Sequence, residues 1–413
     1  MKQQDVEIGS DPAGGTIRKS FADNVSRKLW YLDGKALREQ AQRRTHLEDF
    51  GDPPIEPALS ILTASLETEA DLHALGRFLM RGHLLGILET RLRLASIWGS
   101  RPDSLKTPVE RPVFITGMPR SGSTFLHELL SQDPDSRTPR VWEVMFPVPA
   151  PDESATDRLW RARRANMNLW WFRRLAPGAD EVYPVRAVTP HECLAIHSFT
   201  LMSQEFIATS RVPAYEKFLQ TTGLRPAYVF QKRFLQHLQS RSPLKRWILK
   251  SPDHLYALEE LFSVFPDAMI IQTHRNPLDV LKSSMQLVEV LQGLFGRPDR
   301  ERIQEREART LAETMERSIL FRDKHPELAH RFLDLNYSEI VSDPLGTVRR
   351  IYEHLDCPLM EPALEQMRHF MATRSRYQRR RNPTLADLGL DVVKETRRFQ
   401  NYCRRFGIPM QPA

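Results

Sequence analysis

The chain of 413 residues contains only three cysteines, Cys193, Cys357 and Cys403, which are odd in number and far apart. This scarcity excludes a disulfide framework and a zinc site built from cysteine pairs. The sequence also lacks any apolar run of roughly 18 residues, the length that a membrane-spanning helix needs. Its first segment, MKQQDVEIGSDPAGG, lacks the apolar stretch of a secretory signal. We therefore expect a soluble protein of the cytoplasm.

Lysine is also scarce, because only 12 of the 59 basic residues are lysine and the other 47 are arginine. Arginine suits two-pronged recognition of phosphate, although a biased genome composition explains the same excess. The net charge of +7 is too diffuse over 413 residues to indicate a nucleic-acid partner. The hydrophobic fraction of 41% is enough for a sizeable core. The composition thus indicates a globular protein with an anionic ligand and without a nucleic-acid partner.

The N-terminal part of the chain has a helical pattern. Apolar residues recur at helical spacing from Ser20 to about Arg101, and no alternation typical of strands occurs there. The residues before Ser20 are polar and predict a loose tail, and the prolines of segment 101–111 indicate a linker. We predict a helical N-terminal region over residues 1–110 and a second domain over residues 111–413.

Four short apolar runs follow, and each one ends close to the start of a helical segment. The runs are Pro112–Thr116, Arg246–Lys250, Ala268–His274 and Arg331–Leu335. The helix after the second run is predicted to start at an N-cap, Ser251, and to continue to about Phe265. Strands that alternate with helices predict an α/β fold, with a central parallel sheet flanked by helices. Ligands of such sheets bind beyond the carboxyl ends of the strands.

The segment Gly117–Thr124 keeps the spacing of the phosphate-binding pattern G-x-x-x-x-G-K-[ST] between a strand and a helix. Backbone amides of such a loop and of the first helical turn converge on an anion. The lysine position, however, holds Ser123, and the nearest cation is Arg120. No carboxylate follows an apolar run in the way that a magnesium ligand would. We predict that protein cations bind the anion here and that no metal takes part.

On these residues the sequence resembles the sulfotransferases that use 3′-phosphoadenosine 5′-phosphosulfate (PAPS). Pro119–Thr124 matches the family pattern P-[KR]-[ST]-G-[ST]-[ST], and Arg275 with Ser283 matches its second signature. The resemblance implies a P-loop-like sulfotransferase fold of bacterial type, with PAPS as sulfuryl donor and adenosine 3′,5′-bisphosphate (PAP) as product. It implies that Arg275 and Ser283 hold the 3′-phosphate. The residues implied for the 5′-phosphosulfate are Gly117, Pro119, Arg120, Ser121, Gly122, Ser123 and Thr124.

Sulfuryl transfer to an alcohol needs a base for the acceptor proton and cations at the leaving phosphate. The resemblance implies that Lys250, at the end of an apolar run, contacts the transferred group together with Arg120. For the base it implies Glu143, close to the position of the glutamate in the tyrosylprotein sulfotransferase branch. The second candidate is His191, with Glu192 beside it, although a histidine in a helix is more often structural than catalytic.

Two further segments each have more than one interpretation. Trp160–Arg174 combines five arginines with three tryptophans. It is a helix at a membrane surface, a lid over an acceptor pocket, or a core helix with a charged outer face. In similar proteins a basic C-terminal segment closes over the nucleotide. Tyr377–Gly389, which overlaps the arginines of Arg374–Arg381, either does so here or is a solvated basic loop.

We predict a metal-independent, in-line transfer of a sulfuryl group from PAPS to a hydroxyl of a small-molecule, lipid-like or carbohydrate acceptor. Three alternatives remain at this stage. One is a P-loop nucleotide kinase, which would need Mg²⁺ and a lysine at position 123. The others are a non-catalytic nucleotide-binding scaffold and a scaffold at the membrane surface, in peripheral contact with lipid.

Overall fold

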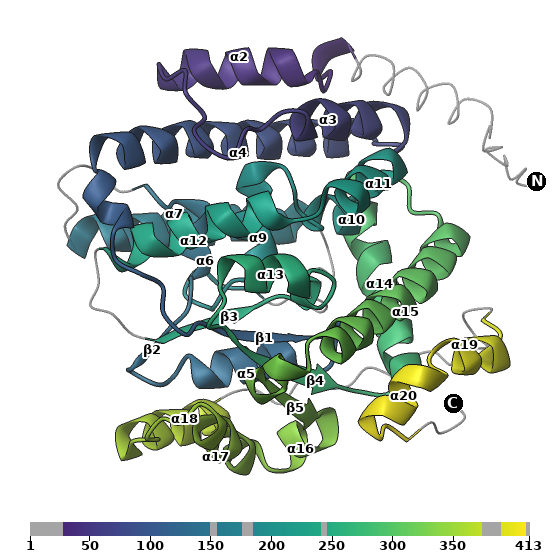
Figure 1. The fold of residues 1–413 in the computed structure, drawn as a ribbon. Coiled ribbons are helices and arrows are strands. Elements are labelled where there is room, and N and C mark those ends of the chain that lie inside the picture. Colours follow the sequence, from purple (N-terminus) through teal and green to yellow (C-terminus); the bar gives the residue numbers. More distant parts are fainter. Residues whose placement is uncertain (1–27, 149–154, 176–184, 241–245, 374–389, 410–413) are drawn as a thin grey trace, which may run out of the picture.

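A computed structural model describes residues 28–148, 155–175, 185–240, 246–373 and 390–409. Its centre is a sheet of five parallel strands in the order β2-β3-β1-β4-β5 (Figure 1). The strands are β1 Val113–Gly117, β2 Ser136–Arg137, β3 Arg246–Lys250, β4 Met269–His274 and β5 Phe332–Asn336. The predicted parallel sheet is confirmed, and β2 is a two-residue edge strand that the apolar pattern did not predict.

Besides a 3-10 turn at Pro102–Leu105, three α-helices make up most of the described part of the N-terminal region, which confirms the helical prediction there. They are α2 Gly34–Thr45, α3 Ala58–Thr68 and α4 Ala74–Ser100. One hydrophobic cluster joins residues of these helices to residues of β1, such as Phe114. The division into two domains after residue 110 stays a prediction, and the predicted tail lies outside the described residues.

The remaining α-helices lie on both sides of the sheet, and only some of them contact it. They are α5 Ser123–Leu130, α6 Val141–Met145, α7 Ala155–Leu175, α9 Cys193–His197, α10 Glu205–Thr209, α11 Pro213–Thr222, α12 Arg225–Gln239, α13 Leu258–Val264, α14 Pro277–Phe295, α15 Arg300–Lys324, α16 Tyr337–Ser342, α17 Pro344–His354, α18 Glu361–Thr373, α19 Val392–Arg398 and α20 Gln400–Phe406. Helices α5, α16, α17 and α18 lie below the sheet in Figure 1, and α9, α12 and α13 lie between the sheet and the N-terminal helices.

Burial on both faces of the sheet explains why β1 is almost wholly apolar. Val113 and Ile115 of β1 belong to the cluster formed with α5, α17 and α18, whereas Phe114 belongs to the cluster on the opposite face. All five residues of β1 are buried. Because helices cover both faces of a parallel sheet, neither set of alternating side chains meets water.

The helix predicted from Ser251 to Phe265 is wrong in its first turns. A 3-10 turn, Pro252–Leu255, comes first, and α13 begins only at Leu258. Ser251 precedes that turn, but its hydroxyl makes no capping hydrogen bond. The hydroxyl of Thr116 instead donates to the carbonyl oxygen of Ser251 at 3.0 Å, which ties the turn to β1. This contact, and a non-helical backbone at Ala257, separate the turn from the helix.

Within the described residues, none of the helices is both long enough and apolar enough to cross a membrane.

Candidate active site

The predicted phosphate loop lies between β1 and α5, at the carboxyl edge of the sheet. The chain forms β2 and β3 on one side of β1 and then crosses to form β4 and β5 on the other side. The loop after β1 therefore lies where the strand order reverses, which is the usual ligand site of open α/β sheets. Lys250 ends β3, Arg275 directly follows β4, and Asn336 ends β5 at the same edge.

The loop needs its glycines for backbone reasons. Gly117 has a φ of +145°, and a Cβ there would lie 2.4 Å from the carbonyl oxygen of Thr273. Gly122 has a φ of +89° and precedes α5 without a side-chain cap. The first amides of α5 thus have no capping side chain, and the N-terminal end of a helix attracts anions.

Ser121 holds the loop to the neighbouring strand. Its buried hydroxyl donates to the carbonyl oxygen of Met118 at 2.6 Å and lies 2.6 Å from the hydroxyl of Thr273. The side chain of Ser121 therefore braces the loop from within. Its predicted part in donor binding stays a prediction.

The two predicted donor motifs are in direct contact. The guanidinium of Arg275 donates to the backbone carbonyl of Arg120 at 2.8 Å and lies over the ring of Tyr337, 4.2 Å from its centroid. Arg120 in turn donates through Nε to the hydroxyl of Ser283 at 3.1 Å. Although Arg120 and Ser283 are 163 positions apart in sequence, the fold assembles them into one polar cluster. Arg120 adopts a φ of +64°, a left-handed conformation that is costly for a residue with a side chain.

Lys250 is a buried lysine, with only 4% of its side chain exposed. Its ammonium group donates to the hydroxyl of Thr124 at 3.2 Å and forms an ion pair with Glu192. A buried ammonium group needs such partners, because moving an unpaired charge from water into the protein interior is costly. The pair places the cation beside the first turn of α5, where the phosphate loop ends.

Two titratable residues near this ion pair were not predicted. Burial and the nearby Glu192 raise the pKa of Asp253 to about 7, and its Oδ2 atom has no partner among the described residues. Burial and the nearby Lys250 lower the pKa of His127 to about 3, and its Nε2 donates to the carbonyl of Ile248 at 3.1 Å. The sequence feature that could have identified Asp253 as a site residue is its position three residues after the predicted strand end at Lys250.

The segments of the two base candidates lie side by side. The amide of His191 donates to the carbonyl of Pro139 at 2.8 Å, and that of Val141 donates to the carbonyl of Thr189 at 3.1 Å. These bonds hold α6, which carries Glu143, against the segment that carries His191 and Glu192. Sequence reasoning treated them as two separate alternatives, whereas the fold brings their segments together.

Glu143 is held at the start of α6 by two nitrogen donors. Its Oε1 atom pairs with the guanidinium of Arg137 at 3.0 Å, and its Oε2 accepts from the amide of Arg140 at 2.9 Å. The side chain is 12% exposed. The carboxylate is thus fixed in place, with a small part of its surface open.

The histidines near this segment are kept neutral by burial. Burial lowers the pKa of His191, whose Nδ1 is buried without a partner among the described residues. Burial likewise lowers the pKa of His197 to about 4, and its Nε2 donates to the side-chain oxygen of Gln231 at 2.7 Å. His197 is therefore a structural residue of the core, whereas His191 keeps a nitrogen without a partner.

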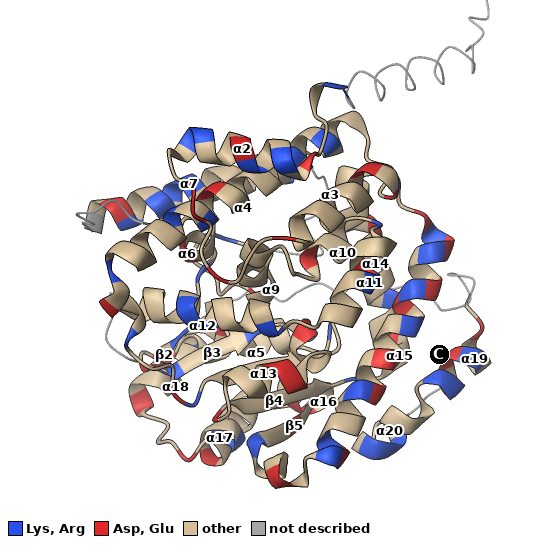
Figure 2. Cartoon of the chain, turned by 45° about the horizontal axis from the view of Figure 1, so that its top comes forward, with Lys and Arg blue, Asp and Glu red and all other residues tan. Residues whose placement is uncertain are grey.

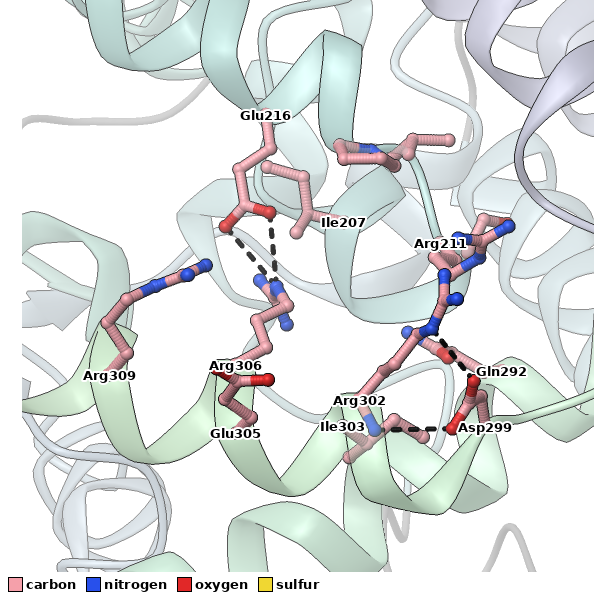
Figure 3. Close-up of a pocket in the computed structure, with 13 residues that line it drawn as sticks. Ile207, Arg211, Glu216, Gln292, Asp299, Arg302, Ile303, Glu305, Arg306 and Arg309 are labelled. Carbon is pink, nitrogen blue, oxygen red and sulfur yellow. Dashed lines mark hydrogen bonds and ion pairs between the residues drawn. The ribbon is translucent and has the colours of Figure 1, made fainter.

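A cavity of about 220 Å³ lies elsewhere, between α10–α11 and α14–α15 (Figure 3). Arg306 and Glu216 form an ion pair across it at 3.2 Å, and Arg302 pairs with Asp299 at 3.0 Å. Gln292 lines the cavity from α14, about 13 Å along that helix from Ser283. No predicted site residue lines this cavity. The arginine-rich segment predicted to close over the nucleotide, Arg374–Arg381, lies outside the described residues.

Comparison with known proteins agrees with this arrangement. The model of a family described as "Sulfotransferase family" matches residues 112–362, which include the phosphate loop, Lys250, Arg275 and Ser283. The chain belongs to the sulfotransferase family. The resemblance inferred from the two motifs is thereby confirmed.

Curated relatives and solved structures point to the same family. The protein named omega-hydroxy-beta-dihydromenaquinone-9 sulfotransferase Stf3, from Mycobacterium bovis and from Mycobacterium tuberculosis, is 28% identical over 281 residues, which are 64% of this chain and 68% of the relative. The crystal structure of sulfotransferase STF9 from Mycobacterium avium matches with a TM-score of 0.81 and 26% identity, over 92% of this chain and 98% of that one. Sulfotransferase STF1 from Mycobacterium tuberculosis matches with a TM-score of 0.77 and 30% identity, over 89% and 98% of the two chains.

Proposed function

We propose that this sulfotransferase moves a sulfuryl group from PAPS to the hydroxyl of a lipid-like acceptor in the cytoplasm, in line and without a metal. The observation that carries the proposal is the contact between the phosphate loop and the Arg275–Ser283 motif. This contact assembles one polar surface that carries two cations, Arg120 of the loop and Arg275 after β4. A donor with phosphates at both its 5′ and 3′ positions requires two such cations. A nucleoside di- or triphosphate would not need the second cation.

In the proposed complex, the loop amides and the first turn of α5 bind the 5′-phosphosulfate. Glycine at 117 and 122 supports this, since the loop backbone adopts conformations and a close approach that a side chain would obstruct. Arg275 and Ser283 bind the 3′-phosphate. The stacking of Arg275 on Tyr337 fixes the direction of its guanidinium before a ligand arrives.

The transfer forms a bond between the acceptor oxygen and sulfur and breaks the bond from sulfur to the bridging oxygen of the phosphosulfate, so that PAP leaves. Lys250 and Arg120 stabilise the negative charge that develops on this bridging oxygen. Lys250 suits this part because it is buried, paired and next to Thr124. Glu192 then acts as the group that holds Lys250 in position.

Glu143 accepts the proton of the acceptor hydroxyl in this scheme. It is fixed by Arg137 and packed through α6 against the segment that leads to Lys250's partner, Glu192. The neutral His191, whose Nδ1 has no partner among the described residues, is the alternative base.

The acceptor class is proposed from the relatives. Stf3 carries the name of a dihydromenaquinone derivative with a terminal hydroxyl, and we transfer the class of acceptor, an apolar alcohol, to this chain. The exposed tryptophans of α7, which packs on the helix of Glu143, support an apolar acceptor.

Calorimetry with nucleotides tests the donor. We expect PAP to bind without Mg²⁺ and at least about tenfold more tightly than ADP, because an added charge-assisted contact gives roughly 1.5–3 kcal/mol. Tighter binding of ADP in the presence of Mg²⁺ would favour the nucleotide kinase instead. Binding of PAP with no sulfuryl transfer from PAPS to any alcohol would favour the non-catalytic scaffold.

A further inference from the structure

The outward face of α7 is unusually apolar for a surface helix. Trp160 is 61% exposed, Trp171 is 56% exposed and Trp170 is 49% exposed. Leu159 and Met167 are also about half exposed. Residues three and four positions apart share one face of a helix, so these side chains form a continuous outward strip. Large exposed apolar strips usually mark an interaction surface.

The same helix is strongly basic. It contains six arginines and one aspartate, Asp157. Arg163 and Arg174 have exposed side chains at helical spacing from the exposed tryptophans, and the guanidinium of Arg174 lies 5.5 Å from the ring centroid of Trp170. Figure 2 shows blue bands, which mark basic residues, on α7 at the left edge of the molecule. Arginine and tryptophan are thus mixed on one exposed strip.

The inner side of α7 attaches it to the helix of the proposed base. Arg161 donates to the carbonyl of Phe146 at 2.7 Å, and its guanidinium lies 4.7 Å from the ring centroid of Trp142. Asn166 accepts from the amide of Ala187 at 3.2 Å, in the segment that leads to His191. These contacts anchor α7 on the side of the site where the acceptor hydroxyl must meet Glu143.

We propose that α7 docks the protein onto an anionic lipid surface, from which the apolar acceptor enters the site. This inference rests on the proposed lipid-like acceptor. Tryptophan rings settle at the boundary between lipid headgroups and acyl chains, and arginines beside them pair with anionic headgroups. The excess of arginine on α7 favours this occupant over a second copy of the chain, because two such faces would repel each other.

Sedimentation with lipid vesicles tests the proposal. We expect the full chain to bind vesicles of phosphatidylcholine mixed with phosphatidylglycerol, to bind pure phosphatidylcholine much less, and to lose binding as salt rises. Trp170→Ala with Trp171→Ala, and separately Arg163→Gln with Arg174→Gln, should each weaken the partition onto the mixed vesicles by about tenfold or more. The matched control is Leu320→Ala with Met360→Ala, which removes apolar side chains that are 56% and 55% exposed outside α7. This control should bind as the unchanged chain does.

Three outcomes would overturn the proposal. They are no binding to the mixed vesicles, equal binding to both kinds of vesicle, and full binding by the tryptophan variant. A change in oligomeric state of that variant in ultracentrifugation, without vesicle binding by the unchanged chain, would assign the strip to a subunit interface. Calorimetry with PAP on the same proteins tests the proposed donor independently of this inference. Vesicle binding without PAP binding would contradict the proposed donor and would still support membrane docking by α7.

Discussion

Lys250 and its partners show how single residues define this site. A lysine at a strand end is a common surface residue, yet here it is buried between Thr124 and Glu192. Its position at the end of β3 was predicted from a five-residue apolar run. Its ion pair with Glu192 was not, because the two residues are 58 positions apart and meet only through the packing of the segment 185–192. Local patterns predict positions along strands, whereas such contacts depend on the whole fold.

Glu143 and Glu192 should respond differently to substitution. Glu143→Gln removes the proposed base, so we expect kcat to fall by about 100-fold or more while PAP affinity stays unchanged. Glu192→Gln removes the partner of a buried ammonium, so we expect weaker PAP binding as well as slower turnover. Steady-state kinetics and calorimetry on both variants check this. The reverse pattern would move the base from Glu143 to Glu192.

Gly117 tests the close approach of the loop to β4. An alanine Cβ at this position would lie 2.4 Å from the Thr273 carbonyl, and the φ of +145° is unfavourable for alanine. We expect Gly117→Ala to lower the free energy of unfolding by about 2–4 kcal/mol and to weaken PAP binding. The matched control is Gly82→Ala in α4, where a Cβ meets nothing within 4 Å and helix propensity should make the variant slightly more stable. Equal denaturant midpoints for the two variants would contradict this description of the loop.

At the level of secondary structure, the sheet and the helices that follow its strands were largely predictable, because buried parallel strands have short apolar sequences. What the periodicity missed depends on tertiary contacts. The break between the Pro252–Leu255 turn and α13 comes with a hydrogen bond from Thr116 on another strand. The strand β2 has only two residues and therefore no period to detect.

A buried arginine of α4 holds the loop between α2 and α3, a contact that local sequence also does not reveal. Arg91 donates to the carbonyl oxygens of Phe50 and Pro53, each at 2.6 Å, and burial lowers its pKa to about 9. We expect Arg91→Met to lower the free energy of unfolding by about 3 kcal/mol, since it leaves buried carbonyls unpaired. The control is Arg93→Met, two positions away with an exposed side chain, which should change stability by less than about 0.5 kcal/mol. Similar melting temperatures for both variants would contradict a stabilising role for the hydrogen bonds of Arg91.

At the scale of the whole molecule, buried histidines set the response to acid. Burial lowers the pKa of His127 to about 3 and of His197 to about 4, and it lowers that of His191 and, further, that of His254. Below the ordinary histidine pKa of about 6.5 the unfolded chain therefore binds protons that the folded chain does not. Stability should fall as pH drops from about 6.5 toward 4, by up to about 1.4 kcal/mol per pH unit for each histidine.

Asp253 acts in the opposite direction over part of this range. Its pKa is raised to about 7, so between about 4 and 7 the folded chain keeps a proton that the unfolded chain releases. His83, whose pKa is raised by its ion pair with Glu205 despite its burial, also favours the folded chain on acidification. These two groups offset two of the four histidines above, and the other two decide the sign. Thermal unfolding at pH 5 and pH 7.5 should give a clearly lower midpoint at pH 5. An equal or higher midpoint at pH 5 would contradict the neutral state of these histidines.

In the proposed function, Arg275 recognises a 3′-phosphate and thereby selects the donor. The most direct measurement is the affinity of PAP and of adenosine 5′-phosphate, which lacks the 3′-phosphate, for the unchanged chain and for Arg275→Met. We predict that the unchanged chain prefers PAP by about tenfold to 100-fold, that Arg275→Met loses most of this preference, and that both bind adenosine 5′-phosphate alike. A preference for PAP that survives in Arg275→Met would show that Arg275 does not recognise the 3′-phosphate.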